Sequence, residues 1–194
     1  LKKNIIDSDK VSSEITFLFG KNSYFIDRYK QSINWLNKYL ELKQSSIHNY
    51  GAFAVKPIRK GARIIEYVGR PLTKKKAQAA LQDGNAYVFT INKHFDIDGE
   101  VPWTPARFIN HGCEVNAESD VEDDRVWIIA TRNIKKGEEI LYNYNYDLED
   151  AFENPCYCGS KNCIGYMVGE DYWPKLRKQI AKRDKKSKWV SVLG

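Results

Sequence analysis

Apolar side chains recur at helical spacing in the N-terminal part of the chain. Between Tyr24 and Lys43 they alternate spacings of three and four residues, at Ile26, Tyr29, Ile33, Leu36 and Leu40. Such a stripe covers one face of an α-helix, and it is too short for a coiled coil, which needs several heptads. We therefore expect an N-terminal helical extension, residues 1–46, whose stripe packs on a neighbouring core.

From about residue 47 the pattern changes to short runs of β-branched and aromatic residues that Gly or Pro interrupts. Four of these runs predict strands: Arg63–Val68, Tyr87–Ile91, Val126–Ala130 and Glu139–Tyr144. Trp173 and Pro174 then open a second helix, because proline is tolerated in the first turn. Strands and helices do not alternate, so the expected fold class is α+β, mainly β, with short sheets, an N-terminal helix and a C-terminal helix.

Composition narrows the class of protein. The 194 residues are 42% hydrophobic and 29% charged, which suits one domain with a core and excludes a disordered chain. No run of 18 apolar residues occurs, and the first residues lack the apolar segment of a signal peptide. We expect no membrane partner and an intracellular protein, nuclear or chromosomal if eukaryotic or host-directed and otherwise cytoplasmic. The sequence begins with leucine and its single methionine is Met167, so it lacks an initiator methionine and we expect it to come from a longer product.

The net charge of +6 is concentrated near the C-terminus. Eight basic residues and one acid lie between Lys175 and Lys188, which leaves 23 basic and 24 acidic residues elsewhere. This tail either contacts nucleic acid, such as nucleosomal DNA, or is a solvated helix. Two acidic stretches, Glu114–Asp124 and Asp147–Glu153, are either solvated loops or a surface that attracts a Lys/Arg-rich peptide.

The four cysteines have the spacing of a metal site. Cys156, Cys158 and Cys163 form a C-x-C-x-x-x-x-C cluster, and Cys113 lies well upstream. Four thiolates favour one closed, tetrahedral, structural Zn²⁺ site that activates no water. Disulfides are disfavoured because Cys156 and Cys158 are too close to pair easily. Free or redox-active thiols remain the alternative.

Four segments together resemble the motifs of SET-domain protein-lysine methyltransferases with a post-SET zinc segment. In chain order they read YGAFAVKPIRKGARIIEYVG, ARFINHGCEVN, ATRNIKKGEEILYNYNYD and CYCGSKNC, between about Ile47 and Met167. The resemblance implies the β-rich, β-clip-like SET fold, in which the second and third segments cross like a pseudoknot. It implies a SET domain over residues 47–149, a post-SET zinc segment over 150–168 and a C-terminal basic helix or tail over 169–194.

Three positions depart from the family pattern. Asn49 stands where the family often has the first glycine of G-x-G, Gly112 replaces the usual serine of NHSC, and Val115 replaces the following proline. Cofactor contacts there run largely through the backbone in the family. We therefore expect these changes to tune cofactor affinity more than abolish it.

The resemblance implies transfer of a methyl group from S-adenosylmethionine (SAM) to a lysine ε-amine of a histone or histone-like basic protein. Tyr144 matches the catalytic tyrosine of the family's GEE-x-x-x-x-Y motif, Tyr142 the Phe/Tyr position that sets methylation state, and Tyr87 a wall of the lysine channel. A tyrosine at 142 predicts mainly monomethylation. The resemblance assigns cofactor binding to a further set of residues: Tyr50, Gly51, Ala52, Asn110, His111 and Tyr144.

Each of these residues also has a simpler interpretation. Tyr142, Tyr144 and Tyr146 alternate, and a strand with one aromatic face toward core or solvent has the same pattern. Tyr87 fits core packing, and His111 fits a structural role for its ring, with adenine contacts made by its backbone. Arg107 and Glu66 are expected to brace the structure.

Two other functions fit part of the sequence. A catalytically inactive SET module that binds basic peptides would keep the fold but not need Tyr144, Asn110 and His111. A zinc-stapled nucleic-acid-binding domain would rely on the basic tail, but the near-neutral body argues against it. A Rossmann-type methyltransferase is disfavoured because no G-x-G-x-x-G follows a strand.

Overall fold

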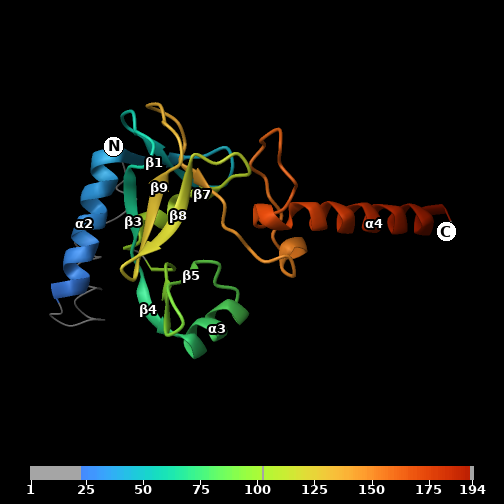
Figure 1. The fold of residues 1–194 in the computed structure, drawn as a ribbon, viewed down its shortest axis with the longest axis horizontal. Helices are drawn as coiled ribbons and strands as arrows, with labels where there is room; N and C mark the ends of the chain where they lie inside the picture. The colour runs from blue at the N-terminus through green and yellow to red at the C-terminus, as the bar shows by residue number, and fades with distance from the viewer. Residues whose placement is uncertain (1–22, 102, 193–194) are drawn as a thin grey trace. The chain divides into compact units, whose positions relative to one another are not determined.

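The computed structural model describes residues 23–101 and 103–192, which belong to two compact units (Figure 1). Unit 1 comprises Leu1–Asn110 and Asn116–Ile140, and unit 2 comprises His111–Val115 and Leu141–Gly194. The first 22 residues of the predicted N-terminal extension lie outside the described residues. Each unit therefore draws on segments that are far apart in the sequence.

The predicted N-terminal helix is present as α2 (Ser23–Tyr39), and it packs against β3 (Arg63–Tyr67). Its stripe contributes Tyr29 to a buried cluster with Val68, Val101 and Trp103, and Ile26 and Ile33 pack around that cluster. The helix ends before the expected Lys43. Residues Leu40–Gln44 instead form β1, which pairs antiparallel with β2 (Tyr50–Ala54).

Within the described part of unit 1 the strands form three small antiparallel sheets (Figure 1). Besides β1–β2, one sheet has the order β3–β9–β8, with β9 at Arg125–Ala130 and β8 at Ala117–Glu122. The other has the order β4–β6–β5, with β4 at Arg70–Thr73, β6 at Phe95–Asp98 and β5 at Val88–Thr90. The predicted α+β, mainly β fold class is confirmed.

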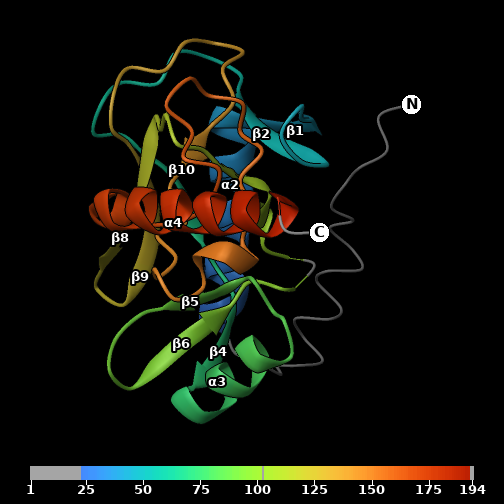
Figure 2. The same ribbon diagram turned by 90° about the vertical axis from the view of Figure 1, so that its right-hand side faces the viewer.

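Helix α3 (Lys74–Gln82) was not predicted, because its KKKAQAALQ sequence lacks a wide apolar stripe. Thr73 caps its N-terminus, accepting a hydrogen bond from the Lys76 N–H, and only Ala77 of the helix is buried. Figure 2 shows α3 beside the strands β4, β5 and β6. Tertiary contact with that sheet therefore supports a helix that its own pattern does not specify.

Glu66 is an acidic residue of unit 1 with no exposed surface. Its carboxylate accepts hydrogen bonds from Arg28 Nε of α2, at 2.8 Å, and from Arg125 Nη2 of β9, at 2.5 Å. Its carbonyl oxygen accepts from the Ser32 hydroxyl, at 3.0 Å. A buried charge needs such partners, because an unpaired one costs several kcal/mol. Glu66 therefore ties α2 to the sheet, the structural role that the sequence suggested.

Regular structure in unit 2 is sparse outside its last helix. The chain passes from unit 1 to unit 2 within β7 (Asn110–His111), which pairs with β10 (Leu141–Tyr142). The predicted strand Glu139–Tyr144 is thus reduced to two residues. Short 3-10 turns η2 (Ala151–Glu153) and η3 (Glu170–Tyr172) precede α4 (Trp173–Val192), the predicted C-terminal helix.

A small apolar core anchors the start of α4. Leu176 is fully buried with Ala151 and Val168, and several partly buried apolar side chains, Ile180 of α4 among them, pack around these three. The described residues of unit 1 also include the 3-10 turn η1 (Pro105–Phe108). None of the helices in the described ranges combines the length and the apolarity needed to cross a membrane.

Candidate functional site

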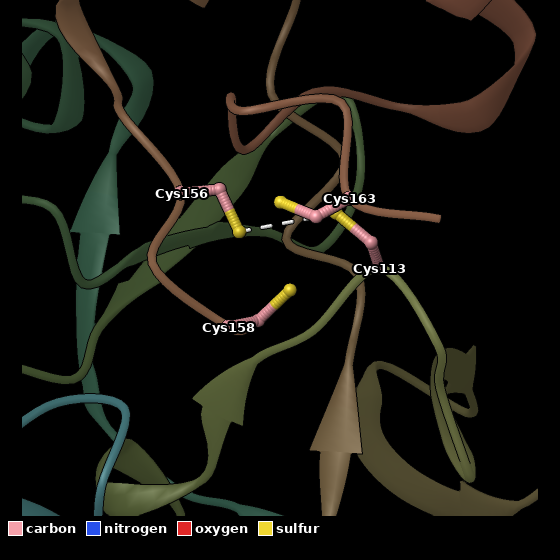
Figure 3. A group of neighbouring side chains, drawn as sticks. All are labelled: Cys113, Cys156, Cys158 and Cys163. Atoms are coloured by element: carbon pink, nitrogen blue, oxygen red, sulfur yellow. Dashed lines mark hydrogen bonds between the residues drawn. The ribbon is translucent and has the colours of Figure 1, made fainter. Parts of the chain in front are cut away.

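Four cysteines converge in unit 2 (Figure 3). Cys113 comes from the segment just after β7, and Cys156, Cys158 and Cys163 come from the loop before α4. Their sulfur atoms all lie within 4.8 Å of one another, and Cys113 and Cys156 are 3.8 Å apart. Ligands about 2.3 Å from a tetrahedral zinc ion are separated by about 3.8 Å, so this donor set can hold Zn²⁺.

The neighbouring thiols strongly shift each other's pKa values. The hydrogen bond with Cys156 lowers the pKa of the Cys113 thiol to about 3, and His111 acts in the same direction. The same contact, together with burial, raises the pKa of the Cys156 thiol. Thiolates this close repel one another, so a cation is the group that would let all four ionise.

Three tyrosine rings lie in contact at the end of β10 and in the residues that follow it. The Tyr142 and Tyr144 ring centroids are 5.0 Å apart, and those of Tyr144 and Tyr146 are 5.9 Å apart. They do not share one strand as predicted, because β10 ends at Tyr142 and Asn145 has a positive φ of 54°. The three rings are nevertheless neighbours. Tyr142 is buried, and Tyr144 and Tyr146 are half-buried.

His111 connects this aromatic cluster to the cysteines. Its Nδ1 accepts the backbone N–H of Tyr144, at 3.2 Å, and its Nε2 lies 3.7 Å from Cys113 Sγ. The imidazole also meets the Tyr144 ring edge-on, at 5.4 Å between centroids. Unit 2 therefore brings together two predicted cofactor residues, His111 and Tyr144, with Tyr142 and all four predicted metal ligands.

Unit 1 brings together a second group of predicted site residues. The side-chain amide of Asn110 donates to Tyr50 O, at 3.1 Å, and to Glu139 Oε1, at 2.8 Å. Gly51 lies against the same carboxylate, so that a Cβ on Gly51 would overlap Glu139. The Asn110 Nδ2 group therefore already donates hydrogen bonds to Tyr50 O and Glu139 Oε1. Among the described residues nothing donates to Asn110 Oδ1, which leaves this oxygen as an acceptor for a bound ammonium group.

The other predicted site residues of unit 1 differ in exposure. Tyr50 is 38% exposed and meets Phe108 edge-on, whereas Ala52 is fully buried in β2, and its carbonyl accepts from Ile140 N. Tyr87 precedes β5 and is 36% exposed, so it is not a core residue. The guanidinium of Arg107 donates to Val101 O, at 3.4 Å, which fits the bracing role expected for it.

Two departures from the family pattern have local physical reasons. Asn49 has φ 37°, and asparagine is among the few residues besides glycine that tolerate this region. Gly112 lies against Leu141, whose Cβ and Cδ1 would be 3.0 Å from a Cβ at position 112. A serine there would crowd Leu141, so the glycine suits this chain.

Sequence reasoning missed the role of Glu139. Its carboxylate accepts from Asn110 and from the Ser45 hydroxyl, at 2.9 Å, and its carbonyl oxygen accepts from Asn116 Nδ2, at 2.7 Å. Glu139 thus links its own motif segment to the segment of Asn110 and Asn116 and to Ser45, just after β1. The second glutamate of the GEE motif is Glu139, so the motif could have drawn attention to it, but only the fold shows which groups its carboxylate contacts.

Taken together, the small antiparallel sheets, the four-cysteine cluster and the tyrosine cluster define a SET-type domain with a cysteine-rich C-terminal segment. A family model described as "SET domain" matches residues 49–145, half of the chain. The chain belongs to the SET-domain family.

Similar proteins carry this domain within much longer chains. Human histone-lysine N-methyltransferase 2D is 36% identical over 161 residues, which cover 78% of this chain and 3% of that protein. Histone-lysine N-methyltransferase set-2 of Caenorhabditis elegans is 34% identical over 145 residues, 70% of this chain and 10% of that one. The chain therefore spans only a small part of these relatives.

A solved structure supports the fold assignment. The crystal structure of KRYPTONITE in complex with mCHG DNA and SAH superposes with a TM-score of 0.55 at 30% sequence identity. The match covers 66% of this chain and 29% of the KRYPTONITE chain.

The cysteine geometry predicts one zinc ion per chain. Elemental analysis of protein purified without chelators should find it, and Cys156→Ser should remove most of it, because three thiolates bind Zn²⁺ more weakly than four. Tyr157→Phe is the matched control, since Tyr157 lies between two of the cysteines but is 74% exposed. Zinc-free wild-type protein that takes up no zinc on titration would contradict the metal site.

Proposed function

We propose that this chain is a SAM-dependent protein-lysine N-methyltransferase that acts mainly as a monomethyltransferase on histone or histone-like proteins. The observation that carries the proposal is the tyrosine cluster: Tyr144 is held by His111 through its backbone and flanked by the rings of Tyr142 and Tyr146. The relatives' names as histone-lysine N-methyltransferases support the same activity.

The chemistry requires an uncharged lysine. A free lysine ammonium has a pKa near 10.4, and only the neutral amine attacks carbon. Aromatic walls exclude water from the ammonium, which lowers its pKa and favours loss of the proton. Tyr142, Tyr144 and Tyr87 are the residues proposed to form these walls, with the Tyr144 hydroxyl orienting the amine toward the methyl group.

SAM, when bound, supplies a methyl group on a positively charged sulfur; the C–N bond to lysine forms as the C–S bond breaks. The residues of unit 1 suit its amino-acid portion. Asn110 Oδ1 can accept from an ammonium group because Glu139 and Tyr50 hold the amide nitrogen. Tyr50 and Gly51 are proposed to bring their backbone to the cofactor, with Ala52 behind them in β2, and His111 to contact adenine through its backbone.

Exposed acidic side chains support the proposal that the substrate is a basic protein. In unit 2, Asp147, Glu149 and Asp171 all raise the pKa of the exposed Tyr172 hydroxyl, Asp147 most of all, so this surface has a negative potential. In unit 1, β8 carries the exposed acids Glu118 and Asp120. Such surfaces attract Lys/Arg-rich segments like histone tails. A histone substrate would place the protein at chromatin.

The basic residues of α4 are proposed to contact DNA of the nucleosome. The apolar side of the helix is used by Leu176 and Ile180, and Arg183 stacks over Phe152, 4.0 Å from its ring centroid. Four other basic side chains of the helix are exposed: Lys175, Arg177, Lys178 and Lys182. Exposed Lys and Arg side chains bind phosphates without reading sequence.

The methyltransferase proposal predicts that Tyr144→Phe lowers kcat about 100-fold or more, because a misplaced amine loses in-line alignment. Transfer of labelled methyl from SAM to a panel of histones and basic proteins measures it, and Tyr39→Phe of α2 is the control tyrosine. A wild-type protein that binds SAM but methylates nothing would favour the inactive peptide-binding module instead.

The proposed product state depends on Tyr142. A tyrosine hydroxyl there would hold a water molecule that blocks a second methyl group, so Tyr142→Phe should shift the product from mono- toward di- and trimethyl-lysine. Mass spectrometry of a methylated histone reads the distribution directly. Mostly trimethylated product from the wild-type chain would refute monomethylation.

The DNA contact predicts a change in salt dependence. Replacing Lys175 and Lys178 by glutamine should weaken binding to a DNA duplex and reduce the slope of log affinity against log salt by about 2, close to 0.9 per lost phosphate contact. The control replaces Lys75 and Lys76, two exposed lysines of α3, by glutamine. Equal losses in both double variants would indicate nonspecific charge attraction and rule out a dedicated α4 contact.

A further inference from the structure

Both ring nitrogens of His111 have partners in unit 2. The residue is only 4% exposed, with Nδ1 3.2 Å from Tyr144 N and Nε2 3.7 Å from Cys113 Sγ. It therefore lies between a predicted metal ligand and the predicted catalytic tyrosine. Neither the methyl-transfer chemistry nor the tetrahedral cysteine site requires this imidazole side chain, so its position needs a separate explanation.

The Tyr144 backbone fixes where the imidazole proton is. A backbone N–H can only donate, so Nδ1 must accept and carries no hydrogen. The hydrogen of the neutral ring is then on Nε2, directed at Cys113 Sγ. A thiolate accepts such a bond, and donors to metal ligands set the direction and charge of the ligand atom. The ring thus donates to the metal site on one side and accepts from the catalytic segment on the other.

Tyr144 depends on this contact because it lies beyond the regular strand. β10 ends at Tyr142, where the Tyr142 carbonyl still accepts from Gly112 N, at 3.2 Å. Two residues later the Tyr144 N–H donates to an imidazole ring. The position of Tyr144 is therefore set in part by where His111 lies, and His111 is two residues from Cys113.

We propose that the His111 side chain is a positioning residue that couples metal binding by the four cysteines to the placement of Tyr144. Loading the cysteine site holds Cys113, Cys113 orients the ring through Nε2–H, and the ring holds the Tyr144 backbone through Nδ1. The functional consequence rests on the proposed role of Tyr144, whereas the coupling itself does not. A buried histidine that only fills space would show no such two-sided dependence.

Two amide substitutions separate the two contacts. In His111→Asn the side-chain oxygen can take the place of Nδ1 and still accept from Tyr144, but nothing reaches Cys113. In His111→Gln the side-chain nitrogen can take the place of Nε2 and still donate to Cys113, but the acceptor for Tyr144 is lost. Both variants retain an uncharged polar side chain, and a general loss of packing should weaken both contacts together, whereas each substitution is expected to remove only one.

Zinc affinity is the first measurement, made by competition with a chromophoric chelator. His111→Asn should weaken zinc binding 10- to 100-fold, the range found for lost partners of metal ligands. His111→Gln should bind zinc within a few-fold of the wild type. Equal zinc affinity in His111→Asn and wild type would overturn the proposed contact with the metal site.

The position of Tyr144 is the second measurement, made by ¹⁹F NMR of fluorotyrosine placed at residue 144. In the wild type, zinc removal should shift this resonance. In His111→Gln the resonance should already be shifted with zinc bound, and zinc removal should then change it less. Fluorotyrosine at Tyr39, in unit 1, is the control. An unchanged Tyr144 resonance in zinc-loaded His111→Gln would refute the coupling.

Kinetics then distinguish this proposal from the proposed function. His111→Gln should lower kcat about 10-fold or more with little change in the KM for the protein substrate, because alignment and not binding is affected. If the wild type transfers no methyl group while both zinc affinity and the Tyr144 resonance respond as expected, the methyltransferase proposal fails and the coupling stands.

Discussion

The close approach of four cysteine sulfurs is the constraint on which unit 2 depends. Few strands and a three-residue buried core, Ala151, Val168 and Leu176, hold the residues around the cysteines. Thiolates within 4.8 Å of one another repel unless a cation binds them. A metal ion would therefore supply the cohesion that so small an apolar core cannot, as it does in other small cysteine-rich segments. It would also join Cys113 to a loop more than 40 residues further along the chain.

Side-chain hydrogen bonds to the backbone hold the candidate site where sheets end. In unit 2, His111 accepts from Tyr144 N, and Asn143 both accepts from Asn145 N, at 2.9 Å, and donates to Val168 O, at 3.1 Å. In unit 1, Asn110 is oriented by a carboxylate and a carbonyl group. Irregular backbone leaves polar groups without ladder partners, and such groups need other partners wherever water does not reach them. Where the short sheets end, side-chain hydrogen bonds determine the conformation of the chain. Tyr144 and Asn110, to which the family resemblance assigns chemistry, lie at such places.

The differences between predicted and observed elements have a common origin in tertiary pairing. Leu40 continues the apolar spacing of α2, yet residues 40–44 form β1 because β2 is available to pair with them. The run from Glu139 to Tyr144 has the alternation of a strand, but only Leu141 and Tyr142 form one, and Glu139 makes an isolated bridge to Phe53. Conversely, α3 forms from a polar, lysine-rich segment, helped by the Thr73 cap and the neighbouring sheet. Local pattern indicates what a segment can form, and the neighbouring segments select among the options.

By itself the sequence determined the fold class, the family, the two terminal helices and the set of four cysteines. These follow from periodicity and from motifs, in which residue type and spacing carry the information. Only the tertiary structure showed that Glu66 pairs with Arg28 and Arg125. It also showed that Glu139 orients Asn110. Finally, it showed that His111 lies between Cys113 and Tyr144. The reason is physical. Hydrogen bonds and ion pairs between distant segments depend on distances of a few ångströms, and these are fixed only when the chain has folded.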